Sequence, residues 1–458
     1  MPASPRYTPD TAITELGPEF YDPVRAAEFP EHTLRYRDDV AAEAVGLHTL
    51  ADGEWLDHFA RFRPLPDNLA EPLALRYHGH QFHTYNPDLG DGRGFLFAQA
   101  RDPQGRLLDL GTKGSGTTPY SRGGDGRLTL LGGVREVLAA RYLQHLGVST
   151  SRALSLVETG EELVRGDEPS PTRSSVLVRL SHSHIRIGTF QRLFFHNETS
   201  NLAKLVAYCQ RHFYPKTETV PDFLQAVVAA CADTTAAWTA AGFVHGVLNT
   251  DNINITGESF DYGPYRFLPH LDPAFTAAYF DQTGLYAFGR QPEAMVWNLA
   301  QLAQALSPLT EADALTAALQ SFAPAYRDRL GHHALRRLHL ARIDPEADAQ
   351  TVAALFRWLE STRAGWPEAW HALAGGLAQV PPGSDIAQHL HGEAWDALEA
   401  RLRLHTPLGE VSEAEPPATL LYDGIGELWA PIRDHDDWSA FSRKLESFQR
   451  LDTGRASH

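Results

Sequence analysis

The fold of this chain is decided by the stretch His245-Gly-Val-Leu-Asn-Thr-Asp-Asn252, which is followed nine residues later by Asp261-Tyr262-Gly263. Asn252 and Asp261 offer hard oxygen atoms, which are the ligands that Mg²⁺ prefers. Asp251 adds a carboxylate directly beside Asn252. The two motifs together predict a loop and a turn that hold a metal ion next to a phosphate-bearing substrate.

The spacing of these residues matches that of a protein-kinase catalytic loop. Kinases write this loop as His-Arg-Asp, four residues, then Asn, and place Asp-Phe-Gly further on. His245 and Asn252 stand at that separation, but Val247 occupies the position of the catalytic Asp and cannot accept a proton. Two interpretations therefore stay open: an inactive kinase, or an enzyme that performs phosphate chemistry in another way. Asp251 is the nearest carboxylate able to replace the missing base.

Length and composition place the chain among ordinary globular proteins. It has 458 residues, 43% hydrophobic and 21% charged, which fits two or three compact units. A net charge of −17 disfavours nucleic acid and anionic membranes as partners. We expect a cytoplasmic location, because the two cysteines, Cys209 and Cys231, form no CxxC pattern and neither a signal peptide nor an apolar run of membrane-spanning length is present.

The region between Asp88 and Gly133 holds twelve of the 36 glycines. Within it, short apolar runs predict strands at 94–99 and 107–111, joined by a turn at 102–105. Apolar residues at helical spacing then predict a helix over 131–146, and two further strands are expected near 155–157 and 175–180. Strand, strand, helix, strand, strand is the order of a kinase N-terminal lobe.

After about Ser200 the chain becomes rich in Ala and Leu, which predicts a mostly helical lobe. Helices are expected at 202–209, 222–241, 292–306, 311–322, 350–363 and 394–404. The expected fold class is therefore α+β, kinase-like and two-lobed, with a β-rich N-lobe and a mostly helical C-lobe. We divide the chain into a helical or irregular N-terminal extension (1–85), an N-lobe with nucleotide-binding loops (86–200) and a helical C-lobe (201–458).

Several basic residues of this acidic chain are candidates for holding nucleotide phosphates. Gly90-Asp-Gly-Arg-Gly94 would let the backbone approach a phosphate and Arg93 donate to it, although a plain hairpin also explains Asp-Gly pairs. Lys113 is 23 residues before Glu136, a separation compatible with the kinase Lys–Glu pair. Arg179 and Arg186 need anionic partners, either nucleotide phosphates or buried carboxylates.

The sequence favours a functional role for one further segment and a structural role for two histidines. The glycine-rich segment 114–127 is long for a loop inside a compact domain, which favours a functional role, and it carries Arg122, Asp125 and Arg127. His182 and His184 are interpreted as structural residues, since no cysteine lies near them to complete a metal site.

Taken together, the motifs resemble the selenoprotein O family. The N-terminal motifs that carry the resemblance are Tyr77-His-Gly-His-Gln-Phe82, Leu89-Gly-Asp-Gly-Arg93, Lys113-Gly-Ser-Gly-Thr-Thr-Pro-Tyr-Ser-Arg122, Gly124-Asp-Gly-Arg127 and Arg135-Glu136. The later motifs are Ser183-His-Ile-Arg186, the 245–252 stretch, Asp261-Tyr-Gly-Pro264 and Phe288-Gly-Arg-Gln-Pro292. The match runs from about Leu16 to Leu306.

The resemblance implies a kinase-like protein adenylyltransferase, or AMPylase. Such an enzyme transfers AMP from ATP, bound in a flipped orientation, to Ser, Thr or Tyr hydroxyl groups of proteins. By this resemblance the catalytic base is Asp251 and the ligands of Mg²⁺, with Mn²⁺ as an alternative, are Asn252 and Asp261. The residues that it implies for binding ATP are Gly90, Gly92, Arg93, Lys113, Asp125, Gly126, Arg179, Arg186 and Asp261. The alternatives are a kinase that transfers the γ-phosphate and an inactive nucleotide-binding scaffold.

Overall fold

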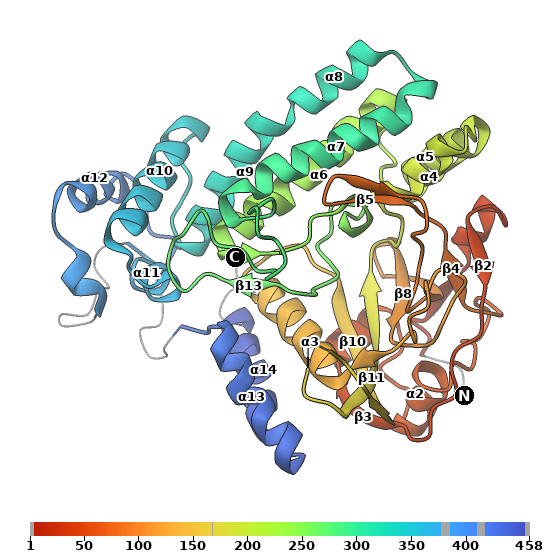
Figure 1. The fold of residues 1–458 in the computed structure, drawn as a ribbon. Coiled ribbons are helices and arrows are strands. Elements are labelled where there is room, and N and C mark those ends of the chain that lie inside the picture. Colours follow the sequence, from red (N-terminus) through yellow and green to blue (C-terminus); the bar gives the residue numbers. More distant parts are fainter. Residues whose placement is uncertain (1–3, 167, 377–384, 410–416, 454–458) are drawn as a thin grey trace.

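The protein is described by a computed structural model that covers residues 4–166, 168–376, 385–409 and 417–453. Figure 1 shows a β-rich lobe built around one sheet and a lobe made mostly of helices. The predicted fold class, α+β with a β-rich N-lobe and a mostly helical C-lobe, is confirmed. No helix among the described residues has the length and apolar character needed to cross a membrane.

The N-lobe is organised by a nine-stranded sheet in which every strand pair is antiparallel. Its main path runs β2-β4-β7-β8-β11-β10-β3, with β1 beside β7 and β9 beside β11. The strands of this sheet are β1 (Thr8–Asp10), β2 (Tyr21–Pro23), β3 (Thr33–Arg37), β4 (Leu73–Leu75), β7 (Leu96–Arg101), β8 (Leu107–Lys113), β9 (Leu128–Thr129), β10 (Arg152–Leu163) and β11 (Thr172–Ser181). Two separate hairpin-like pairs are β5 (Gly79–Gln81) with β6 (Thr84–Asn86), and β12 (Phe243–Val244) with β13 (Arg266–Phe267).

The sheet is covered on both faces, because its strands alternate two sets of apolar side chains. Val176 and Val178 of β11 pack with Trp55 of α2 (Asp52–Phe59), on the face that also carries α1 (Asp39–Ala44). Leu177, which lies between the two valines, packs on the opposite face with α3 (Leu130–His145). This period of two places Arg179, two residues after Leu177, on the α3 face of the sheet.

The N-terminal 85 residues differ from the helical or irregular extension that the sequence suggested. They contribute β1, β2, β3 and β4 to the central sheet, in addition to α1 and α2. These strands are three to five residues long, too short to show the alternation from which strands are predicted. The division of the chain at residues 85 and 200 stays a proposal.

The C-lobe packs its helices around a long central one, α6. Its helices are α4 (Ile187–Phe195), α5 (Thr199–His212), α6 (Val220–Ala241), α7 (Gln291–Leu306), α8 (Ala312–Gln320), α9 (Phe322–Arg337), α10 (Pro345–Thr362), α11 (Trp366–Ala372) and α12 (Glu393–Leu402). All six helices expected after residue 200 are present, with shifted ends. The helices α4, α9 and α11 were not predicted.

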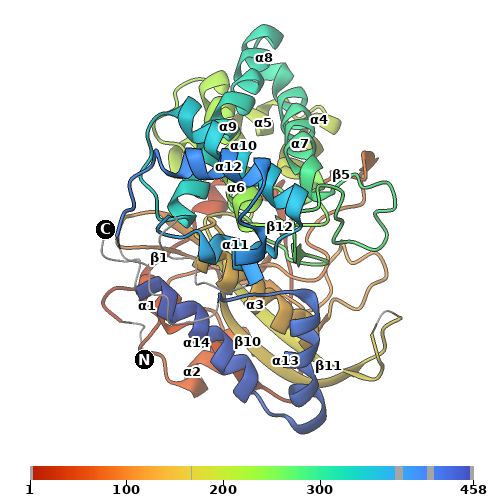
Figure 2. The ribbon, with the colours of Figure 1, turned by 90° about the vertical axis from the view of Figure 1, so that its left-hand side faces the viewer.

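The last two helices leave the C-lobe and lie against the N-lobe. Figure 2 shows α13 (Tyr422–His435) and α14 (Ser439–Thr453) beside α3, β10 and β11. The ring of Phe448 on α14 contacts that of Tyr142 on α3, with 5.0 Å between centroids. On β11, Arg173 donates to the backbone oxygen of Ile432 at 2.9 Å. The C-terminal helices therefore support the helix that carries Glu136.

Candidate active site

A pocket lies where the α3 face of the sheet meets the turn at Asp261. Four of the side chains in its wall are cations, from β8, β11 and two loops: Arg93, Lys113, Arg179 and Arg186. The other lining residues are Tyr77, Asp91, Gly92, Gly94, Phe95, Thr112, His184 and Asp261. A concentration of positive charge inside a protein of net charge −17 indicates a site for an anion.

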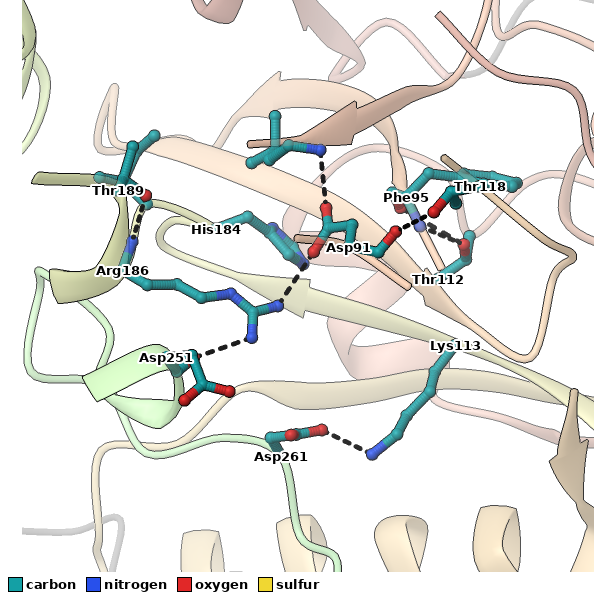
Figure 3. A network of polar contacts seen from close by, with 12 residues as sticks. Asp91, Phe95, Thr112, Lys113, Thr118, His184, Arg186, Thr189, Asp251 and Asp261 are labelled. Carbon is teal, nitrogen blue, oxygen red and sulfur yellow. Dashed lines mark hydrogen bonds and ion pairs between the residues drawn. The ribbon is translucent and has the colours of Figure 1, made fainter. Parts of the chain in front are cut away.

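Lys113 is held in this pocket by two carboxylates. Thr129 caps the start of α3 by accepting from the amide of Gly132 at 3.0 Å, which fixes where Glu136 falls on the helix. Lys113 is 4% exposed; its Nζ forms an ion pair with Glu136 and another, of 2.5 Å, with Asp261 Oδ1. The Lys–Glu pair predicted from the spacing is therefore present (Figure 3 draws Lys113 with Asp261).

The two buried arginines have carboxylate partners of their own. Arg179 lies 3.4 Å from Asp261 Oδ1, and Arg186 lies 3.2 Å from Asp91 Oδ1. The Arg186 guanidinium also packs over the ring of Tyr77, 4.5 Å from its centroid. Burial opposes the charge of Arg186, but the acidic groups around it hold its pKa above the ordinary value. Both cations are thus fixed before any anion binds, and their partners compensate the cost of burial.

Asp251 lies behind Arg186, on a short 3-10 helix over Thr250–Asn252. Arg186 donates to the backbone oxygen of Asp251 at 2.9 Å, as Figure 3 shows. The side chain is 8% exposed, and its Oδ1 has no hydrogen-bond partner. Burial raises the pKa of Asp251 to about 6, against the opposing charge of Arg186. A buried carboxylate with an unused oxygen is chemically suited to accept a proton near neutral pH.

The Asp261 turn is tied to the catalytic loop by His245. Helix α6 ends at Gly242, whose φ of +70° only glycine adopts readily, and β12 then leads into the loop. His245 is buried, and its Nε2 donates to the backbone oxygen of Phe260 at 2.9 Å. This hydrogen bond fixes the backbone of the residue immediately before Asp261 and so helps to position the turn. His245 thus has a structural role in the motif.

Asp261 is the ionised carboxylate of the pocket. Burial would raise its pKa, but Lys113 and Arg179 outweigh that effect and hold the pKa well below the ordinary value. Asn252, the other predicted metal ligand, donates its amide to the backbone oxygen of Val247 at 3.1 Å. The described residues contain no group of three or more His, Cys, Asp or Glu suited to hold a metal.

The predicted glycine-rich residues divide into two groups. Gly92 lines the pocket, and Gly90 lies under Tyr120, where a Cβ would come within 2.3 Å of the ring. Asp125 and Gly126 do not line the pocket. Asp125 instead forms an ion pair of 2.8 Å with Arg165, and Gly126 packs against the backbone of Gly116. Their predicted role in binding ATP stays a prediction.

Among the pocket residues that the sequence analysis did not choose as site residues, three have polar side chains that bear on the chemistry: Asp91, Tyr77 and His184. Asp91 lies in the glycine-rich stretch 90–94, from which Gly90, Gly92 and Arg93 were chosen as site residues. Its position in that stretch could therefore have identified it. Tyr77 is the first residue of a motif that carries the family resemblance, but it was not chosen as a site residue. His184 was interpreted as structural, but it lines the pocket. Its place depends on a contact with β8 that no local pattern reveals.

The β-rich lobe carries a strand lysine paired with a helix glutamate, and it faces the loop and turn that contain His245, Asn252 and Asp261. This arrangement defines a protein of the kinase-like fold class. Comparison with known families is more specific. The family model described as protein adenylyltransferase SelO matches residues 5–449. The chain belongs to this family.

Curated relatives align over nearly the whole chain. A protein nucleotidyltransferase YdiU from Trichodesmium erythraeum is 48% identical, covering 95% of this chain and 97% of its own. Proteins of the same name from Gloeobacter violaceus and Synechocystis sp. are 45% and 43% identical, covering 94% and 96% of this chain and 93% and 98% of theirs.

One solved structure that matches this chain is ROP2 from Toxoplasma gondii, described as a virulence factor with a protein-kinase fold and no enzymatic activity. It is 12% identical, covers 63% of this chain and 83% of its own, and has a TM-score of 0.27. A score this low adds nothing to the fold described above.

Proposed function

We propose that this chain is a protein adenylyltransferase, which transfers AMP from ATP to Ser, Thr or Tyr hydroxyl groups of proteins and releases pyrophosphate. Membership of the SelO family supports the reaction class. The observation that carries the proposal for this chain is the pocket, which is lined by Arg93 and by three cations held by carboxylates, Lys113, Arg179 and Arg186. Arg186 also contacts Asp251, a buried carboxyl group whose pKa of about 6 suits a proton acceptor.

The cations account for how the nucleotide is held. Arg93, Lys113, Arg179 and Arg186 line one pocket, so a polyphosphate bound there meets preorganised positive charge. In the proposed orientation the β- and γ-phosphates occupy this pocket and the α-phosphate lies toward Asp251. Because Asp261 and Asp91 already neutralise the two buried arginines in part, a bound phosphate adds to an existing network.

Asp251 is the proposed base in a balanced transfer. The acceptor hydroxyl oxygen forms a bond to the α-phosphorus, and its proton passes to Asp251. The bond between the α-phosphorus and the oxygen that bridges to the β-phosphorus breaks, and that electron pair leaves with pyrophosphate. At pH 7 a carboxyl group of pKa about 6 is mostly ionised and can therefore take the proton. The buried Arg186 beside it limits how far Asp251 can move.

Asn252 and Asp261 are the residues proposed to hold Mg²⁺, or Mn²⁺. When bound, this ion would supply positive charge that offsets the charge developing on the phosphates. Asp261 also pairs with Lys113, so one carboxylate would connect the ion with the lysine of the pocket. The cytoplasm is the proposed location; both cysteines are free and buried, as expected for a reducing compartment.

The proposal is tested by incubating the chain and candidate acceptor proteins with ATP labelled at either the α- or the γ-phosphate, in the presence of Mg²⁺. We expect label on protein from the α-position alone, and a mass increase equal to one AMP. Label from the γ-position would identify a kinase. Nucleotide binding without labelling of either kind would identify a scaffold, the function that Val247 in place of the usual catalytic Asp favours.

A further inference from the structure

We propose that His184, held in place by Asp109, is a further nucleotide-binding residue, and that its Nε2 donates a hydrogen bond to a phosphate oxygen of the bound nucleotide. This rests on the proposed function, because it requires the phosphate chain to occupy the cationic pocket. His184 lines that pocket and is 6% exposed.

Asp109 fixes both the position and the proton of the imidazole. It is 2% exposed, and its Oδ2 accepts from the backbone amide of His184 at 2.8 Å and lies 3.2 Å from its Nδ1. The other oxygen, Oδ1, accepts from Gln99 at 2.7 Å. An ionised carboxylate only accepts hydrogen bonds, so Nδ1 carries a hydrogen in this contact. Nε2 is therefore the ring nitrogen that remains available to a ligand.

The sequence of β8 makes room for the ring. Asp109, Gly111 and Lys113 are separated by two residues each and so lie on one face of the strand. A Cβ at Gly111 would come within 1.9 Å of His184 Nε2. The absence of a side chain there lets the imidazole rest on the strand beside the lysine that faces the pocket. Nε2 has no hydrogen-bond partner within the described parts of the chain.

The charges around the ring favour a phosphate over the adenosine end of the nucleotide. The pocket wall carries four cations and two carboxylates: Arg93, Lys113, Arg179, Arg186, Asp91 and Asp261. Asp109 lies behind the ring of His184 and does not line the pocket. A neutral imidazole with hydrogen on Nδ1 would accept at Nε2, which suits a ribose hydroxyl. With hydrogen on both nitrogens, the imidazole donates to Asp109 behind the ring and to a phosphate oxygen in front of it.

The test uses the variant His184→Asn. The Asn amide can still donate to Asp109 from about the position of Nδ1, but nothing replaces Nε2. Binding of AMP, ADP and α,β-methylene-ATP is measured by calorimetry with Mg²⁺ present. We expect the variant to bind the triphosphate analogue about 10-fold or more weakly, since a charge-assisted hydrogen bond is lost, and to bind AMP as the natural chain does.

A matched control comes from the same segment. His182 donates its backbone amide to Glu258 at 2.9 Å and does not line the pocket. His182→Asn should leave all three affinities unchanged. A second variant, Gly111→Ala, displaces the ring with an added methyl group and leaves the chemistry of the ring unaltered. We expect it to weaken binding of the triphosphate analogue selectively as well.

The outcomes separate this inference from the function on which it rests. If the natural chain prefers the triphosphate analogue to AMP and His184→Asn keeps that preference, the inference about His184 is wrong. If His184→Asn weakens the binding of AMP and of the analogue equally, the inference is also wrong. That result would indicate that His184 contacts adenosine or has a structural role. If the natural chain binds AMP as tightly as the analogue, the assignment of the phosphates to this pocket is itself wrong.

Discussion

Replacing Asp251 by Asn should make the protein more stable and less active at the same time. Asp251 is 8% exposed, and burial raises its pKa from the ordinary 3.8 to about 6. The folded protein therefore binds the proton more tightly than the unfolded chain does. Ionising Asp251 consequently lowers the free energy of unfolding, by about 3 kcal/mol for a shift of roughly two units. Asn carries no charge and avoids this cost.

The sign of the effect sets its pH window. Below about pH 4 Asp251 is protonated in both states, so the variant and the natural chain should be nearly equally stable. The advantage of the variant should grow between about pH 4 and 6 and be complete above pH 6. The assay is urea unfolding followed by tryptophan fluorescence at several pH values, with EDTA and without nucleotide, because a bound ion would change the charge near Asp251.

The same variant should lose AMP transfer by about 100-fold or more, since a positioned general base typically contributes that much. Refutation would take either of two forms. If the variant is less stable than the natural chain at pH 8, ionised Asp251 has a stabilising partner outside the Arg186 network. A transfer rate within a few-fold of the natural chain would show that Asp251 is not the base.

Three further predictions concern the pocket and its surroundings. Glu136→Gln removes the ion-pair partner of Lys113, so we expect about 10-fold or greater loss of AMP transfer in a labelling assay; unchanged transfer would contradict the role of the pair. Asp261→Asn should abolish the response of transfer to added Mg²⁺, and it should also lower the melting temperature, because Lys113 and Arg179 lose a carboxylate partner; a retained metal response would exclude Asp261 as a ligand. Burial raises the pKa of Glu258 to about 7, so Glu258→Gln should be more stable to urea above pH 7 by about 3 kcal/mol and gain nothing below about pH 4.5; a gain independent of pH would show that charge is not the cause.

The long periodic elements of the fold were predictable from the sequence. The helix expected at 131–146 is α3 (Leu130–His145), and the strands expected at 107–111 and 175–180 lie within β8 and β11. Their apolar positions repeat often enough to give a signal. The strands before residue 85 are short, and they form only because the central sheet offers them an edge, which no local pattern shows.

The site was predictable where chemistry follows linear spacing and not where it depends on packing. Lys113 and Glu136, which are 23 positions apart in the sequence, form the expected ion pair in the structure. Asp125 and Gly126 were chosen by family resemblance alone, and the structure places them away from the pocket wall. His184 enters the pocket because Gly111, on a distant strand, leaves space for its ring. Such a contact exists only after the sheet has formed.

The orientation of the bound nucleotide tests the central claim most directly. The measurement is a crystal structure of the protein with α,β-methylene-ATP and Mg²⁺. We predict the β- and γ-phosphates against Lys113, Arg179 and Arg186, with the α-phosphorus as the phosphorus atom nearest Asp251. Adenine seated among these cations, with the γ-phosphorus beside Asp251, would contradict the account.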